Sequence, residues 1–210
     1  MQRRRKPGRP PKTATSVSPR ERLLRSAGEL FYRKGIATTG VDELTAHAGV
    51  SKMSLYSHFR SKDRLAAAYV DDMGRAWQSW LDEWMSRGPA APGARLLHVF
   101  DGVGEWMAQS GFCGCPFINA AAQLNDASHP AFRAATSQKA ALRARFLQLA
   151  REAGLRAPER VARELALLAD GAMVAAAMER SKVPVAAARA AAATLVAIRR
   201  RRGTSSTLPR

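Results

Sequence analysis

Side chains that can donate hydrogen bonds to an anion gather between residues 39 and 62 of this 210-residue chain. They are hydroxyl groups, ammonium groups and an imidazole, carried by Thr39, Lys52, Ser54, Tyr56, His58 and Lys62. Hydroxyl and ammonium groups bind phosphate oxygens, and such groups near the start of a helix can also reach the edges of bases. Lys52 and Ser54 therefore suit base edges, whereas the other hydroxyls and Lys62 suit phosphates.

Two short helices joined by a tight turn must position these side chains. Thr39 can cap the first helix, and Gly49 permits the tight or left-handed backbone at its end. Ser51 then caps the second helix within a few residues. Leu55 and Phe59 lie four residues apart and give this second helix one buried face. Its polar residues consequently point outward, where they could enter a groove of DNA.

Three segments of this stretch match a known pattern, namely Thr39–Leu44 (TGVDEL), Ala48–Lys52 (AGVSK) and Leu55–Leu65 (LYSHFRSKDRL). Together with the residues from Ser18 onward, they resemble the TetR family of bacterial transcriptional regulators. The resemblance covers roughly the first third of the chain. It implies that DNA contacts come from the positions of Thr39, Lys52, Ser54, Tyr56, His58 and Lys62.

Two positions of the second helix leave alternatives open. Met53 departs from the small residue or proline that the family often has there. Its side chain could contact a thymine methyl group or only fill a gap. His58 could bind a phosphate or a neighbouring side chain. Both residues remain candidate DNA contacts.

Longer helices flank this stretch. Ser18 can cap a helix that starts with a proline, and Glu21 completes a capping box. Apolar residues then recur at helical spacing up to Gly35, namely Leu23, Leu24, Ala27, Leu30 and Phe31. Another helix, capped by Ser61, should run to about Arg87. This long helix would connect the DNA-binding part to the rest of the chain.

Turn and stop residues separate five further expected helices, at about 93–109, 116–125, 130–153, 158–181 and 184–201. We therefore predict an all-α fold, with an N-terminal three-helix helix-turn-helix domain and a C-terminal helical domain for effector binding and dimerisation. The expected segments are a disordered basic arm (1–17), the helix-turn-helix domain (18–64), the helical body (65–201) and a basic tail (202–210).

Positive charge concentrates at the two ends of the chain. Of the net charge of +17, residues 1–20 contribute +7 and residues 199–210 contribute +5. Such arms favour a polyanion, because each phosphate contact releases condensed counterions. A membrane partner is not expected, because no apolar run approaches the ~18 residues of a spanning helix. We expect a bacterial cytoplasmic protein associated with the nucleoid.

The basic arm contains a more specific pattern. Gly8, Arg9 and Pro10 resemble the core of an AT-hook, a peptide that lies in the narrow minor groove of A·T-rich DNA. Proline keeps the chain extended, and Arg9 could enter the more negative groove. The alternative is an unspecific basic arm that contacts phosphates.

Aromatic residues in the expected body form a candidate effector site. Trp77, Trp80 and Trp84 share one helix face. Trp106 and Phe117 could join them, and the nearby polar candidates for orienting a ligand are His98, Asn119 and Gln123. We predict a partly aromatic cavity for a largely apolar small molecule. The alternative is that these residues only pack against one another.

The two cysteines suggest little chemistry. Cys113 and Cys115 lie in a segment, Gly111–Asn119, that resembles a loop-to-helix connection in a subset of the TetR family. They lack the second pair of ligands that zinc requires, so we expect them to be small buried hydrophobic residues. The four histidines have no nucleophile or metal partner nearby in the sequence. No cofactor, metal or enzymatic activity is therefore expected.

Small and aliphatic residues form stripes on the last two expected helices. They are Leu165, Leu168, Ala169, Ala172 and Ala176 on one, and Val185, Ala188, Ala192, Leu195 and Val196 on the other. Such stripes could be internal core. The family resemblance instead implies a homodimer, in which these two helices pair with their symmetry mates as a four-helix bundle.

The sequence thus predicts a regulator that binds a double-stranded, palindromic DNA operator as a dimer. The resemblance implies a repressor that a small-molecule effector releases. One alternative is an architectural DNA-binding protein without an effector. Another is a redox sensor or enzyme that uses Cys113 and Cys115.

Overall fold

The computed structural model describes residues 17–108 and 111–200. Within these residues the chain forms α-helices and no strand, so the predicted all-α fold is confirmed. The helices are α1 (Pro19–Lys34), α2 (Val41–Ala48), α3 (Lys52–Phe59), α4 (Lys62–Ser86), α5 (Pro92–Met107), α6 (Pro116–Leu124), α7 (Pro130–Glu152), α8 (Pro158–Glu179) and α9 (Val183–Arg199). The arm with Arg9 and the tail from residue 201 lie outside the described residues.

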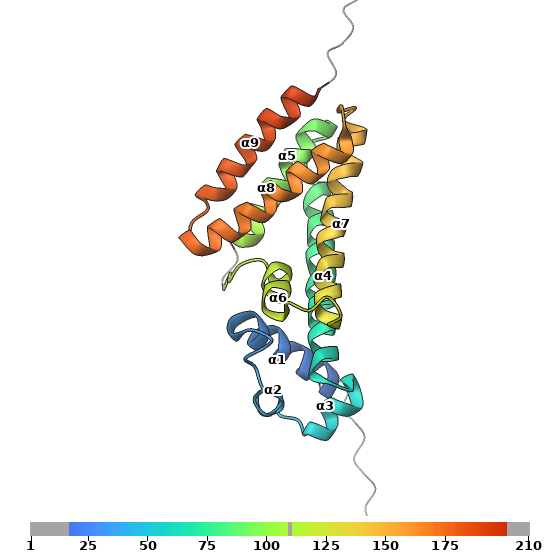
Figure 1. Cartoon of the computed structure of the whole chain (residues 1–210), viewed down its shortest axis with the longest axis vertical. Coiled ribbons are helices and arrows are strands. Elements are labelled where there is room, and N and C mark those ends of the chain that lie inside the picture. The colour runs from blue at the N-terminus through green and yellow to red at the C-terminus, as the bar shows by residue number, and fades with distance from the viewer. Residues whose placement is uncertain (1–16, 109–110, 201–210) are drawn as a thin grey trace, which may run out of the picture.

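Helices α1, α2 and α3 form a small head at one end of the molecule (Figure 1). The predicted capping box starts α1, because the Ser18 hydroxyl accepts the Glu21 amide at 3.2 Å and the Glu21 carboxylate accepts the Ser18 amide at 2.8 Å. The head core is apolar and consists of Leu23, Ala27, Phe31, Leu44, Leu55 and Phe59. Burial of these side chains holds α2 and α3 against α1.

The start of α2 differs from the prediction. Its N-cap residue is Gly40, and no side chain caps it. The Thr39 hydroxyl instead donates to the Gly35 carbonyl at 2.7 Å, and the Thr39 side chain is fully buried. Asp42 and Glu43 in the first turn can stabilise the positive end of the helix without a cap. The predicted end is confirmed, since Gly49 adopts the left-handed conformation with a φ of 61°.

Helix α4 connects the head to the body. The Ser61 hydroxyl caps it by accepting the Arg64 amide at 3.1 Å, as predicted. Its 25 residues span about 37 Å at the usual helical rise. The helix crosses the predicted domain boundary at residue 65 without a break, packing on α1 near its start and on α7 further along. The division into two domains therefore stays a prediction.

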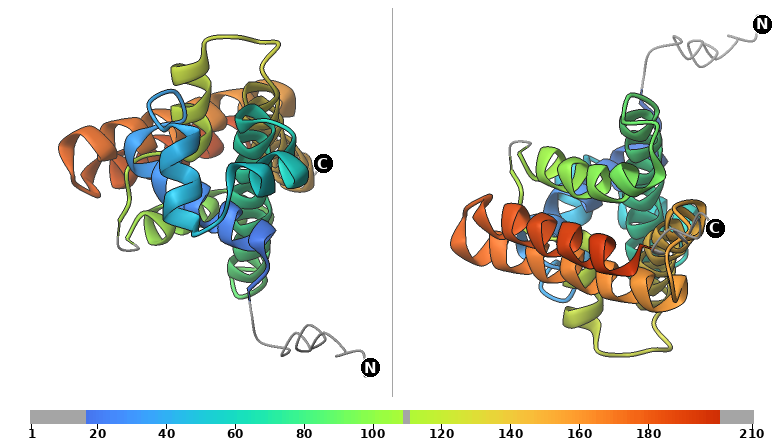
Figure 2. Two further views of the ribbon diagram at one scale, coloured as in Figure 1. Left: turned by 90° about the horizontal axis from the view of Figure 1, so that it is seen from below. Right: turned by 90° about the horizontal axis from the view of Figure 1, so that it is seen from above.

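Helices α5 to α9 and the second half of α4 form the body. Phe100 of α5 and Phe146 of α7 are fully buried at its centre, with ring centroids 5.7 Å apart. Figure 2 shows α8 and α9 side by side along one flank of the body. The helix ends agree with the sequence prediction to within about two residues, because prolines near each start and turn residues after each end act locally.

The stripes predicted for the dimer interface lie largely in the core of one chain, where Val185 and Val196 of α9 come close to Gly104 and Gly93 of α5. Leu165 and Ala169 of α8 and Ala192 of α9 are fully buried within the protomer. Small side chains let the two helices approach closely, which explains the alanine-rich pattern. Most residues expected to face a partner therefore belong to the core of the chain, and the predicted homodimer through these two helices stays a prediction.

The described residues contain neither a membrane-spanning helix nor a metal-binding cluster. No helix among them is long and apolar enough to cross a membrane. The described His, Cys, Asp and Glu side chains form no group that could hold a metal ion.

Candidate nucleic-acid interface and internal cavity

One face of α3 is exposed to solvent, and its opposite face is buried in the head core. The Ser51 hydroxyl caps the helix by accepting the Ser54 amide at 3.2 Å, and Leu55 is fully buried in the head core. Met53 is 81% exposed and Tyr56 is 49% exposed. These values leave the outer face of the helix free to enter a groove of about 12 Å width.

The carboxylate of Asp42 in α2 lies beside the polar residue that starts α3. The Lys52 ammonium pairs with Asp42 of α2, and this hydrogen bond raises the pKa of Lys52 above its ordinary value. Lys52 therefore remains charged, and a DNA phosphate or base edge would compete with Asp42 for it. His58 is exposed, whereas Ser54 is half-buried. The structure thus brings together Lys52, Met53, Tyr56 and His58 as an accessible set.

Two predicted DNA contacts, Thr39 and Lys62, make hydrogen bonds within the chain. The buried Thr39 hydroxyl cannot reach a phosphate while it bonds to Gly35. The Lys62 ammonium donates to the carbonyl oxygens of Ile36 and Thr39, at 3.0 and 3.1 Å. Lys62 thereby ties the start of α4 to the connection between α1 and α2. The contacts of Lys62 join residues 23 and 26 positions apart, which a local pattern does not reveal. Thr39 bonds within four residues, and only its burial depends on the fold.

Arginine residues beside α3 add positive charge that the sequence analysis did not assign to the interface. Arg60 and Arg64 are exposed just after α3, and the Arg20 guanidinium lies 5.3 Å from the Phe59 ring centroid. Arg22 has a structural role, because it donates to the Gly49 carbonyl at 3.0 Å and holds the turn between α2 and α3. Only the local excess of arginine in the sequence could have indicated this set.

Hydrogen bonds join the head to the segment that precedes α6. The Tyr32 hydroxyl donates to the Gly114 carbonyl at 2.8 Å and accepts the Cys113 amide at 2.9 Å. The Gln123 side-chain oxygen accepts the Ile36 amide at 2.7 Å. Gln123 therefore lies at the boundary between head and body and does not line the internal cavity of the body, and its role at an effector site stays a prediction.

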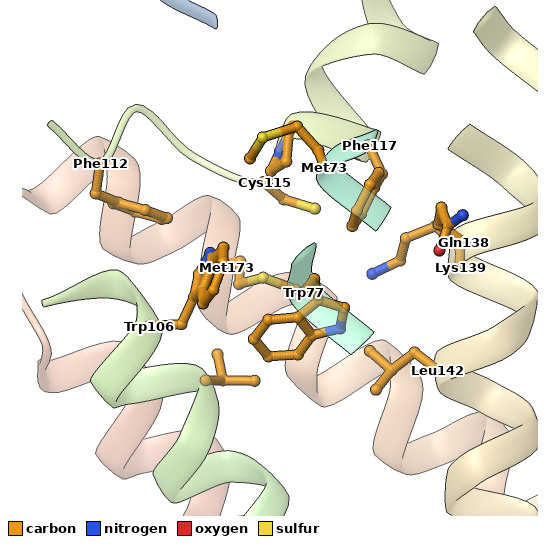
Figure 3. Close-up of a pocket in the computed structure, with 12 residues that line it drawn as sticks. Met73, Trp77, Trp106, Phe112, Cys115, Phe117, Gln138, Lys139, Leu142 and Met173 are labelled. Atoms are coloured by element: carbon orange, nitrogen blue, oxygen red, sulfur yellow. The ribbon is translucent and has the colours of Figure 1, made fainter. Parts of the chain in front are cut away.

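An apolar cavity lies inside the body, between α4, α5, α7, α8 and the start of α6. It encloses about 490 Å³ of empty space, including its open mouth. The part of this space that water-sized molecules can occupy is about 30 Å³, so an organic ligand requires the lining side chains to move apart. Three of the predicted aromatic residues, Trp77, Trp106 and Phe117, line it (Figure 3). The other lining residues are Met73, Val103, Phe112, Cys115, Pro116, Gln138, Lys139, Leu142 and Met173.

The remaining predicted ligand residues lie elsewhere. Trp84 stacks on His98 with ring centroids 4.9 Å apart, and its indole N–H donates to the His98 carbonyl at 3.1 Å. Trp80 stacks between Trp77 and Trp84. Trp80 and Trp84 thus pack at the contact between α4 and α5, whereas Trp77 both packs there and lines the cavity. Asn119 donates to the Cys113 carbonyl at 2.9 Å and does not line the cavity.

The two cysteines differ in environment. Cys113 is exposed, so its predicted burial is wrong, whereas Cys115 is buried as expected and lines the cavity. Burial raises the pKa of the Cys115 thiol above its ordinary value. A neutral thiol is a poor nucleophile, which disfavours redox chemistry at this position.

Comparison with known proteins agrees with this architecture. The three-helix head with its helix-turn-helix, joined to a helical body, places the chain in the class of helix-turn-helix DNA-binding proteins. Residues 23–69 match the family described as "Bacterial regulatory proteins, tetR family". A TetR-type regulator from Streptomyces avermitilis is 35% identical, with 84% of this chain and 98% of that chain covered and a TM-score of 0.71. The chain belongs to the TetR family, as the sequence pattern predicted.

Two further relatives agree with this membership. SCO4454, a TetR-family regulator from Streptomyces coelicolor, is 28% identical over 87% of this chain and 96% of its own, with a TM-score of 0.81. The HTH-type transcriptional repressor NemR from Escherichia coli is 29% identical over 54% of this chain and 58% of its own. The sequence matches thus span about half the length of the curated relatives.

Proposed function

We propose that the protein is a sequence-specific transcriptional repressor that binds a palindromic operator as a homodimer. The observation that carries the proposal is the outer face of α3, where Met53 and Tyr56 are exposed while Leu55 is fixed in the core. A rigid helix with a free polar face is the form in which helix-turn-helix proteins read the major groove. The exposed arginines beside α3 suit the flanking phosphates.

Assembly as a dimer is supported by the outer face of α8 and α9. Large apolar side chains are exposed there, namely Leu167, Val174, Met178, Val183 and Ile198. Exposed apolar residues that gather on one flank favour a protein partner. A symmetric dimer through this face would place two copies of α3 on one side, one or two DNA turns of about 34 Å apart.

A small molecule in the internal cavity would release the operator. The cavity and the head share the segment 112–117. Phe112, Cys115 and Phe117 of this segment line the cavity. Its residues Cys113 and Gly114 form hydrogen bonds with Tyr32 of the head. A ligand that favours one arrangement of this segment would also bias the position of α1. The effector would then stabilise a state in which the two α3 helices no longer match the operator.

A footprint on the DNA that flanks the protein's own gene tests this proposal. The expected result is a protected palindrome at low protein concentration, with strong dependence on salt. Protection without sequence preference would contradict a repressor. It would favour the architectural alternative, which the charge at the chain ends supports. Deleting residues 1–16 separates the two, because a repressor keeps its sequence preference with weaker affinity.

The redox alternative has its own test. Replacing Cys113 and Cys115 with serine removes both thiols. An operator response to oxidant that is unchanged in this variant would exclude a thiol sensor. We expect that outcome, because the buried Cys115 thiol has a raised pKa.

A further inference from the structure

A single charged side chain lines the internal cavity. Among the described lining residues, only Lys139 carries a formal charge at neutral pH, and no carboxylate is present there. Figure 3 shows the Lys139 side chain extending from α7 toward Trp77 and Phe117. An ammonium group in an aromatic cavity is costly unless a partner compensates its charge. The partner of the Lys139 ammonium therefore indicates which kind of ligand the cavity can bind.

The present partner of Lys139 is Asp170 of α8, which does not line the cavity. An ammonium group has three N–H donors. Within the described chain only one hydrogen bond from it is found, the one to Asp170. Donors therefore remain available on a group that reaches the cavity.

The other polar lining groups are neutral or engaged. The Gln138 side-chain oxygen accepts a hydrogen bond from Gln78 at 2.7 Å. The Cys115 thiol is kept neutral by burial, which raises its pKa. An aromatic cavity could also attract a cation through the ring faces. The positive charge of Lys139 opposes that choice, because two like charges would share a poorly hydrated space.

A second observation points to the same sign of charge. Phe112 lines both the cavity and an open groove on the surface of the body. Along this groove, the described lining includes Arg180 and Lys182 and no acidic residue. Clefts with one sign of charge raise the local concentration of oppositely charged ligands. An anionic ligand would thus find positive charge in the surface groove, at Arg180 and Lys182, and again in the internal cavity, at Lys139.

We infer that the effector is a flat aromatic molecule with one carboxylate, which binds Lys139 while its rings lie against Trp77 and Phe117. This inference rests on the proposed effector function of the cavity. A charge-assisted hydrogen bond supplies affinity and orientation, and the aromatic walls supply apolar contact. The ligand carboxylate competes with Asp170 for the same ammonium group.

Calorimetric titration with three compounds of matched shape tests the inference: 2-naphthoate, 2-naphthamide and 2-naphthylmethylamine. For the unmodified protein we expect 2-naphthoate to bind about tenfold more tightly than the amide, and the amine to bind weakest. Equal affinities, a preference for the amide or the amine, or no binding of any compound would overturn the inference.

Two variants sharpen the test. Asp170→Asn removes the competing carboxylate but keeps its shape, so 2-naphthoate should bind more tightly while the amide is unaffected. The double variant Lys139→Gln with Asp170→Asn removes both charges and should lose the preference while it still binds the amide. If Asp170→Asn weakens both compounds equally, the ion pair is only structural and the inference fails.

The same protein samples in an operator gel shift separate this inference from the proposed function. Specific operator binding that only neutral compounds release would overturn the carboxylate class and leave the repressor intact. Absence of specific operator binding would instead contradict the proposed function, whatever the calorimetry shows. Release by 2-naphthoate, lost in the double variant, is the result expected when both hold.

Discussion

At the scale of single residues, Lys52 offers the clearest test of base reading. It lies at the start of α3, is exposed, and is held by Asp42 of the neighbouring helix. We predict that Lys52→Met costs about 1–3 kcal/mol of operator affinity and relaxes the preference at one position in each half-site. Competition gel shifts with singly substituted operators measure both effects.

Tyr56→Phe is the matched comparison for that variant. It removes one exposed hydroxyl from the same face of α3. We expect a loss of about 1 kcal/mol that is the same for all operator sequences, because phosphate contacts carry no sequence information. If Lys52→Met also weakens every sequence equally, Lys52 contacts phosphate and not a base.

Thr39 shows how burial changes a residue's role. Its hydroxyl bonds to the Gly35 carbonyl and its side chain is fully buried. Thr39→Val keeps the shape and removes this hydrogen bond, so we expect unfolding in urea to require about 1 kcal/mol less free energy. Operator affinity of the folded protein should not change. A selective loss of operator affinity at unchanged stability would restore Thr39 as a DNA contact.

At the scale of elements, the contact between α1 and the segment before α6 is the expected path between effector and head. Tyr32→Phe removes both hydrogen bonds of the Tyr32 hydroxyl. Because coupling between two sites is reciprocal, operator binding should alter amide exchange of residues 112–117 in the unmodified protein. We predict that Tyr32→Phe reduces this change.

Gln123→Leu provides a second variant at the same boundary, because it removes the acceptor of the Ile36 amide. It should weaken the coupling as well, without reaching the cavity lining. The operator-dependent change in amide exchange of residues 112–117 is compared among both variants and the unmodified protein. If it is the same in all three, the coupling takes another route, such as α4.

At the scale of the whole molecule, the proposed dimer depends on the outer flank of α8 and α9. Leu167 and Met178 are 66% and 80% exposed in the protomer. Replacing both with glutamate would place charges in an apolar interface and weaken the dimer by more than about a hundredfold. Analytical ultracentrifugation should then detect monomers with much reduced operator affinity.

Ala144→Glu is the control for this pair of substitutions, because Ala144 is an exposed residue of α7 outside the proposed interface. We expect this variant to remain dimeric. A monomeric unmodified protein, or a dimer that tolerates both glutamates, would contradict the proposed interface.

The features that could be predicted from the sequence are those that depend on interactions between residues close together along the chain. The serine caps of α1, α3 and α4 and the prolines at the starts of α5 to α8 act within about four residues, so the helices could be located from the sequence. The pattern from Thr39 to Leu65 also identified the family. These features determine the class of protein.

Only the tertiary structure decided which residues face solvent, core or cavity. Trp77 lines the cavity while Trp84 on the same helix face packs on His98, and the Leu165 stripe is buried within the protomer. Lys139 became a candidate ligand contact only because α7 carries it into an aromatic space. The physical reason is that helical periodicity defines a face, whereas what that face meets depends on how separate helices pack together.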